Sequence, residues 1–205
     1  MKTKEKILVV SLELFNELGI ANLAAIDVAN EMDISPGNLY YHYKGKGEIL
    51  ATLLERYERT LQDGFRNPIR AANAGEESWL YFYALAELMY NYRFLFRSIA
   101  DIKESFPDVE RCINRILLSK FNVVSDILTA ITTLDDSAPS DDLPMDAVMV
   151  MLLNWFNYRG LANPGEPIQS LIHSLMVRIE RLLLPYCSIE MCGYMRLSNE
   201  NYAAG

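Results

Sequence analysis

Apolar residues recur at helical spacing along the first third of the chain, and short breaks divide this pattern into four segments. The first segment keeps Ile7, Phe15 and Leu18 on one face, and Gly19 follows as a stop signal. The second and third segments are about two turns long, whereas the fourth stripe continues for about twenty residues, to just before Pro68. The pattern predicts helices over residues 3–18, 25–32, 36–43 and 46–66.

The remainder of the chain carries longer apolar stripes. Residues 76–98 are rich in aromatic side chains and apolar on two faces, which predicts a helix at the centre of a helical body. Polar, proline-bearing loops are expected at 67–75 and 135–144. The tail after Pro185 is weakly patterned, so we expect it to be only partly ordered. Further helices are predicted over residues 109–134, 145–161 and 168–184, and the predicted fold class is all-α.

The most distinctive stretch runs from Ile34 to Lys46 and contains no acidic residue. Ser35 can accept the free N–H groups of a helix start, and the proline after it suits a first turn that needs no N–H. Leu39 and Tyr43 then lie one turn apart and are expected to face inward. The other side chains offer hydroxyl, amide, imidazole and ammonium groups, which bond to phosphate oxygens and base edges. These side chains are Asn38, Tyr40, Tyr41, His42, Lys44 and Lys46.

Helix, short helix, tight turn and short helix is the order of a helix-turn-helix unit, whose last helix enters the major groove of DNA. The run Ile-Ser-Pro-Gly-Asn-Leu-Tyr-Tyr-His-Tyr-Lys-Gly-Lys-Gly-Glu-Ile-Leu, with the upstream Asp27-Val28-Ala29, resembles the DNA-binding signature of the TetR family of bacterial transcriptional regulators. Beyond residue 50 the chain resembles that family only in being helical. The resemblance implies a three-helix DNA-binding domain followed by a larger helical domain for ligand binding and dimerisation.

The resemblance also implies roles for residues of the third helix. Phosphate contacts are implied for Tyr41, His42 and Lys46, and base contacts for Pro36, Gly37, Asn38 and Tyr40. Other positions depart from the family pattern: Leu23 and Ala24 replace a phosphate-binding Thr or Ser, Ile26 a frequent Arg, and Pro36 a basic residue. Each loss removes a contact worth about 1–3 kcal/mol at most. The scaffold is unaffected, but the operator sequence cannot be read from these residues.

Charge, hydropathy and cysteine spacing narrow the function further. Residues 1–50 hold five lysines and seven acidic residues, a formal charge of −2, although nucleic-acid-binding domains are usually basic. The longest apolar run, Ala147–Leu153, is too short to span a bilayer, and the first residues do not form a signal sequence. The three cysteines have no CxxC spacing. We expect a cytoplasmic protein with no membrane partner, no cofactor and no metal site.

Motifs of catalysis are missing from the sequence. Gly45-Lys46-Gly47 is not followed by the Lys-Ser/Thr pair of a phosphate-binding loop, no GxSxG elbow occurs, and no histidine lies within one helical turn of a cysteine. We therefore expect that the protein is not an enzyme.

The helical body supports two hypotheses that periodicity alone leaves open. Its aromatic segment can wall a cavity for a small apolar or amphipathic effector, with an arginine holding an anionic head, or can be plain core. Its last two long helices can pair with a second copy as a four-helix bundle or pack within one monomer. The dimer is favoured because a single short helix reads only a few base pairs. The candidate effector residues are Trp79, Phe82, Tyr83, Met89, Arg93, Arg97, Phe121 and Trp155, and the candidate dimer residues are Met149, Leu152, Phe156, Leu171, Leu175 and Ile179.

The predicted organisation is a DNA-binding domain at residues 1–48, a connecting helix at 46–66, an effector-binding and dimerisation domain at 67–190, and a tail at 191–205. The predicted function is a sequence-specific repressor that leaves its double-stranded operator when the effector binds. The alternative is a regulator-like helical protein with eroded DNA contacts, acting through a ligand or a protein partner. A salt series separates the two functions, because DNA binding driven by phosphate contacts weakens steeply as the salt concentration rises, whereas a role through a protein partner predicts no dependence on DNA.

Overall fold

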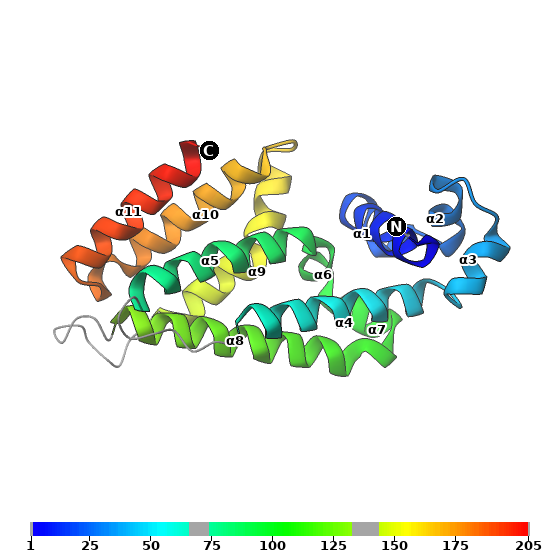
Figure 1. Ribbon diagram of the computed structural model, residues 1–205, viewed down its shortest axis with the longest axis horizontal. Coiled ribbons are helices and arrows are strands. Elements are labelled where there is room, and N and C mark those ends of the chain that lie inside the picture. Colours follow the sequence, from blue (N-terminus) through cyan, green and yellow to red (C-terminus); the bar gives the residue numbers. More distant parts are fainter. Residues whose placement is uncertain (1, 66–73, 133–143, 205) are drawn as a thin grey trace. The chain divides into compact units, whose positions relative to one another are not determined.

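The computed structural model describes residues 2–65, 74–132 and 144–204, and every regular element in these ranges is a helix (Figure 1). The predicted all-α fold is confirmed. The predicted loops at 67–75 and 135–144 lie outside the described residues, apart from their C-terminal ends. Within the described ranges, no helix has the length and hydropathy needed to cross a membrane. The α-helices are α1 (Thr3–Leu18), α2 (Ala25–Glu31), α3 (Pro36–His42), α4 (Lys46–Gly64), α5 (Ala74–Asn91), α6 (Arg93–Arg97), α7 (Ile99–Ser105), α8 (Glu110–Thr132), α9 (Met145–Ala162), α10 (Ile168–Leu183) and α11 (Ile189–Ala204).

Contacts divide the chain into two compact units. The first comprises Met1–Thr60 and Asn91–Leu117, and the second comprises Leu61–Tyr90 and Leu118–Gly205. The first unit therefore holds the three N-terminal helices and most of α4, together with α6, α7 and the beginning of α8. It extends well beyond the domain boundary predicted at residue 48.

The end of α1 shows why one glycine is required there. Gly19 has φ 82°, a conformation that side chains with a Cβ rarely adopt, and its N–H donates to the Phe15 carbonyl at 3.1 Å. A Cβ at this position would come within 2.8 Å of the Arg97 guanidinium. The backbone conformation therefore favours glycine, whereas the end of the exposed Arg97 side chain can move aside.

Asn16 explains why α5 stops in a segment that was predicted to continue as one helix to residue 98. The side-chain Nδ2 of Asn16 donates to the Asn91 carbonyl at 2.8 Å, and its Oδ1 accepts the Phe94 N–H at 3.1 Å. This amide replaces backbone bonds of a continuous helix, so the chain turns at Tyr92 and begins again as α6. The Phe94 ring then packs 5.4 Å from the Phe15 ring, between centroids.

In the second unit, α10 packs along α11 and against α9 (Figure 1). The expectation of a partly ordered tail is corrected here, because residues 189–204 form α11. A chain of buried polar groups joins this helix to its neighbours. The Tyr83 hydroxyl on α5 donates to Asn199 Oδ1, and Asn199 Nδ2 donates to the Glu180 carboxylate at 2.6 Å. Burial raises the pKa of Tyr83, so the phenol stays protonated and remains a donor.

Candidate nucleic-acid interface

The turn between α2 and α3 is tight and closed by backbone hydrogen bonds. Asp33 adopts φ 52°, and the Ile34 N–H donates to the Ala29 carbonyl at 3.0 Å. The Ser35 hydroxyl then accepts the Asn38 N–H at 3.2 Å, which confirms the predicted cap of α3. This is the geometry of a helix-turn-helix, in which a short turn sets the direction of the last helix.

The outer face of α3 presents the predicted DNA-binding side chains to solvent. Tyr40 is 52% exposed and Tyr41 84% exposed, while the inward Leu39 and Tyr43 are 0% and 1% exposed, as predicted. The His42 ring is half-buried and lies edge-on to the Tyr41 ring, with 5.1 Å between centroids. The remaining exposed positions are Pro36, Gly37, Asn38 and Lys44.

Lys46, for which the resemblance implies a phosphate contact, has a structural role in the first unit. Its Nζ donates to the Ile20 carbonyl at 2.8 Å and to the Leu23 carbonyl at 2.6 Å. Burial lowers the pKa of this lysine, and the nearby Asp27 carboxylate opposes that effect. The ammonium thus ties the start of α4 to the segment before α2, and at most one N–H remains for phosphate.

The N-terminal end of α1 is tied to the end of α3, which the sequence reading missed. The Tyr43 hydroxyl donates to the Lys4 carbonyl at 3.4 Å, and the Lys4 ammonium lies 5.2 Å from the centre of the Tyr43 ring. Lys4 is exposed and adds a positive charge close to the end of α3. The lysine cluster at the N-terminus was visible in the sequence, but nothing in its spacing predicts a contact with Tyr43.

The acidity of the chain is unevenly divided between the two units. The first unit, Met1–Thr60 with Asn91–Leu117, contains 12 basic and 13 acidic residues, a formal charge of −1. The second unit contains the other 7 basic and 14 acidic residues, a charge of −7. The low pI of the whole chain therefore reflects the second unit, and the unit that carries α3 is almost neutral.

The candidate effector residues are divided between the two units. Trp79, Phe82 and Met89 have no exposed surface, and Tyr83 is held in the polar network with α11. Trp155 donates through Nε1 to the Leu171 carbonyl at 2.9 Å. Phe121 is 45% exposed, and Arg93 and Arg97 belong to the first unit while the other six belong to the second. Most of these aromatic residues therefore form core.

Most of the candidate dimer residues lie in the core of the second unit. Five of the six are already buried within the single chain, because these faces of α9 and α10 pack inside the second unit. These five side chains therefore offer little exposed surface to a second copy. The five are Leu152, Phe156, Leu171, Leu175 and Ile179, whereas Met149 is half-buried.

No three metal-binding side chains converge anywhere in the part of the chain that the structure describes. Cys112, Cys187 and Cys192 form no disulfide within the described ranges. Burial raises the pKa of Cys112 to about 11, with the Glu58 carboxylate adding to the effect, so this thiol is a poor nucleophile at neutral pH.

Comparison with known proteins agrees with this geometry. Residues 7–53 match the family described as "Bacterial regulatory proteins, tetR family", and residues 56–191 match the TetR family described as "Bacterial transcriptional repressor". The "Probable HTH-type transcriptional regulator YttP" of Bacillus subtilis (strain 168) is 26% identical over 103 residues, which are 48% of this chain and 49% of that protein. The chain thus spans about half the length of this curated relative.

Two solved structures extend the likeness to nearly the whole chain. A TetR-family transcriptional regulator from Marinobacter aquaeolei VT8 aligns with a TM-score of 0.73 and 26% identity, covering 98% of this chain and 99% of that one. A bacterial regulatory protein in the tetR family from Rhodococcus RHA1 aligns with a TM-score of 0.66 and 19% identity, covering 92% and 99%, and supports the fold alone. With family matches over both the helix-turn-helix and most of the remaining helices, the chain belongs to the TetR family of bacterial transcriptional regulators.

Proposed function

We propose that this chain binds a double-stranded operator through α3 and represses transcription until a small molecule releases it. The observation that carries the proposal is the acid-free outer face of α3, where Asn38, Tyr40 and Tyr41 are exposed beside Lys44. These groups can bond to base edges and phosphates, while Leu39 and Tyr43 anchor the helix from behind. Operator binding implies that the protein acts in the bacterial cytoplasm.

The DNA-binding test is fluorescence anisotropy with duplex DNA from upstream of the protein's own gene, and with duplexes selected from a random library. Asn38→Ala is expected to weaken binding to the selected duplex by about 1–3 kcal/mol and to relax its sequence preference. Lys44→Met is expected to weaken all duplexes alike and to lower the salt slope by about 1. The matched control is Asn201→Ala, an exposed asparagine on α11.

Failure of every duplex to bind at low salt would refute this function. It would favour the alternative of a regulator-like protein that acts through a ligand or a protein partner. The departures at Leu23, Ala24 and Pro36, together with the internal bonds of Lys46, support that alternative.

A single α3 reads only a few base pairs, so operator recognition requires a dimer. We propose that the exposed apolar face of α9 forms the dimer interface. Val150 is 60% exposed, Tyr158 60% and Leu161 79%, and their spacing places them on one side of the helix. Tyr158→Asp is expected to convert a dimer to a monomer in sedimentation equilibrium, with the helical content unchanged. A wild-type monomer at micromolar concentration, or a variant that still dimerises, would contradict this surface.

For the effector we propose a small apolar or amphipathic molecule bound in the second unit, whose interior is rich in aromatic side chains. Both α4 and α8 begin in the first unit and end in the second, so a ligand that favours one packing of these helices can shift the DNA-binding equilibrium. An effector screen by thermal shift, repeated with operator present, tests the coupling. An effector that binds with equal affinity to free and operator-bound protein would refute release.

A further inference from the structure

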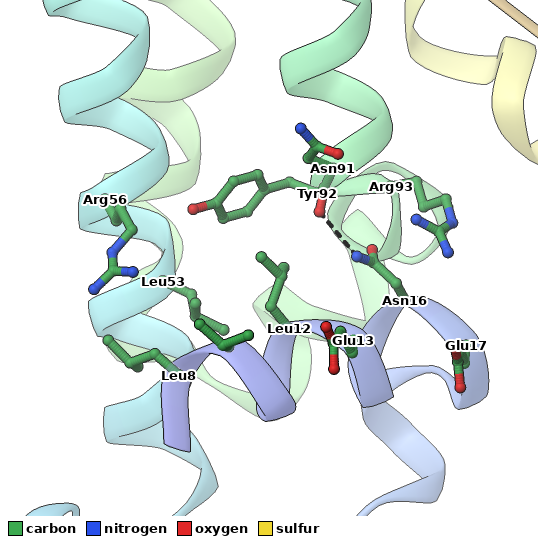
Figure 2. A pocket seen from close by; sticks show the side chains of 11 residues that line it. Leu8, Leu12, Glu13, Asn16, Glu17, Leu53, Arg56, Asn91, Tyr92 and Arg93 are labelled. Carbon is green, nitrogen blue, oxygen red and sulfur yellow. Dashed lines mark hydrogen bonds between the residues drawn. The ribbon is translucent and has the colours of Figure 1, made fainter. Parts of the chain in front are cut away.

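The first unit contains an open cavity of about 380 Å³ between α1, α4 and the start of α6 (Figure 2). This volume lies within the range of about 300–1,000 Å³ that is usual for small-molecule sites. Every lining residue belongs to the first unit, so the cavity is separate from the effector site proposed in the second. Nothing in the proposed repressor function uses it.

The floor of this cavity is apolar. Leu8 and Leu12 of α1 face Leu53 of α4, and the Tyr92 ring reaches across above them from the corner between α5 and α6 (Figure 2). An aromatic or branched apolar body can bury surface against these four side chains at about 25 cal/mol for each Å² removed from water. The floor therefore selects an apolar ligand body.

The Tyr92 hydroxyl is a polar group left for a ligand. Tyr92 is only 6% exposed, it lines the cavity, and its hydroxyl makes no hydrogen bond with any residue in the described ranges. Burial raises the pKa of this phenol, while the positive charge of Arg56 opposes the effect. The phenol is therefore neutral and can accept a hydrogen bond from a ligand.

The charge around the cavity is negative once internal ion pairs are taken into account. Arg56 is occupied by Glu5, with bonds of 2.7 and 2.9 Å to the two carboxylate oxygens. Glu13 and Glu17 lie one turn apart on α1, are exposed, and make no ion pair within the described part of the chain. Against these two carboxylates the lining supplies only the charge of Arg93, which leaves an excess of one negative charge.

We propose that this cavity binds an amphipathic organic cation: an ammonium group held by Glu13 and Glu17, with an aromatic or branched body over Leu12, Leu53 and Tyr92. This site lies in the unit that carries α3, and it prefers a cation although Arg93, a candidate anchor for an anionic effector head, is among its lining residues. The proposal does not depend on DNA binding, because its test measures the small molecule directly.

The test compares three probes of one shape by isothermal titration with the full chain: 1-naphthylmethylammonium, 1-naphthylmethanol and 1-naphthoate. The cation is expected to bind most tightly and the anion not measurably. Glu13→Gln/Glu17→Gln is expected to weaken the cation about three- to tenfold and to leave the neutral alcohol unchanged, because two exposed ion pairs are lost. The matched control Glu31→Gln/Glu104→Gln removes two exposed carboxylates outside the cavity and is expected to change nothing.

A second pair of variants places the probe. The Tyr92 hydroxyl points toward Arg56 and away from Glu13 and Glu17 (Figure 2), so Tyr92→Phe is expected to leave binding of the cation unchanged. Leu12→Trp, which fills the floor, is expected to abolish binding of both cation and alcohol. Glu13 and Glu17 are exposed, so their double variant folds even if Leu12→Trp does not, and circular dichroism checks each protein. The proposal is overturned if no probe binds, if the alcohol binds as tightly as the cation, or if the glutamate variant binds the cation like the control.

Discussion

Replacing Lys46 with methionine separates a structural lysine from a phosphate-binding one. Methionine keeps the length and the apolar stem but removes the ammonium that donates to the carbonyls of Ile20 and Leu23 at 2.8 and 2.6 Å. We expect Lys46→Met to lower the free energy of unfolding. The matched control is Lys44→Met, since Lys44 is exposed and only its backbone N–H is bonded, to Glu48 at 2.6 Å.

The magnitude follows from the two bonds and from what offsets them. A hydrogen bond from a charged donor contributes about 1.5–3 kcal/mol, so two contribute about 3–6 kcal/mol at most. Desolvation of the half-buried ammonium, which lowers the pKa of Lys46, opposes this contribution. We therefore expect a net loss of about 2 kcal/mol, or about 4–8 °C in Tm for a chain of this length.

Urea and thermal unfolding followed by circular dichroism, at one pH and one ionic strength, measure this loss. Lys44→Met is expected to stay within about 0.5 kcal/mol of the wild type, as exposed substitutions usually do. If Lys46→Met unfolded at the wild-type urea concentration, the bonds to the two carbonyls would contribute nothing. That result would refute the structural role of Lys46 and leave its ammonium available for the phosphate contact that the family resemblance implies.

Three further predictions concern stability. Gly19→Ala should cost about 1–2 kcal/mol, because φ 82° is strained for alanine; an unchanged urea midpoint would contradict this. Asn199→Leu should cost about 2–4 kcal/mol, since it leaves the buried Glu180 carboxylate without its amide donor; hydrogen exchange should show α11 opening first, and full protection would contradict it. Bonds from Arg115 lower the pKa of Glu58, so this carboxylate stabilises the fold above its unfolded-state pKa, and the stability is lost as pH falls through the lower folded-state value. Glu58→Gln should flatten the acid limb of an unfolding curve against pH, and an unchanged limb would refute the linkage.

Local signals were sufficient wherever a helix begins or ends on its own residues. Ser35 and Pro36 predicted the start of α3, and Gly19 predicted the end of α1, because caps and stops depend on backbone groups within a few positions. The inward Leu39 and Tyr43 followed from helical spacing alone. The outer face of α3 was accessible to sequence reasoning for the same reason.

Local signals failed where a distant side chain replaced a local partner. The break at Tyr92 has no glycine or proline and depends on Asn16, which lies 75 residues before Asn91 in the chain. The sequence did not predict that the tail forms the helix α11, because the inner face of this helix includes a polar residue. That face consists of Met191, Met195 and Asn199. That asparagine becomes a core residue only when Tyr83 and Glu180 surround it.

The sequence by itself therefore determined α1 to α4, the caps at Gly19 and Ser35, the exposed outer face of α3 and the family resemblance, all of which depend on residues close together in the chain. Only the tertiary structure decided that Lys46 bonds to carbonyls, that the inner faces of α9 and α10 are buried within one chain, and that a cavity opens between α1 and α4. Periodicity shows that a face is buried but not against what, because one apolar stripe packs equally well on its own chain or on a partner. Which carboxylates stay unpaired, such as Glu13 and Glu17, is likewise settled only when helices distant in sequence come together.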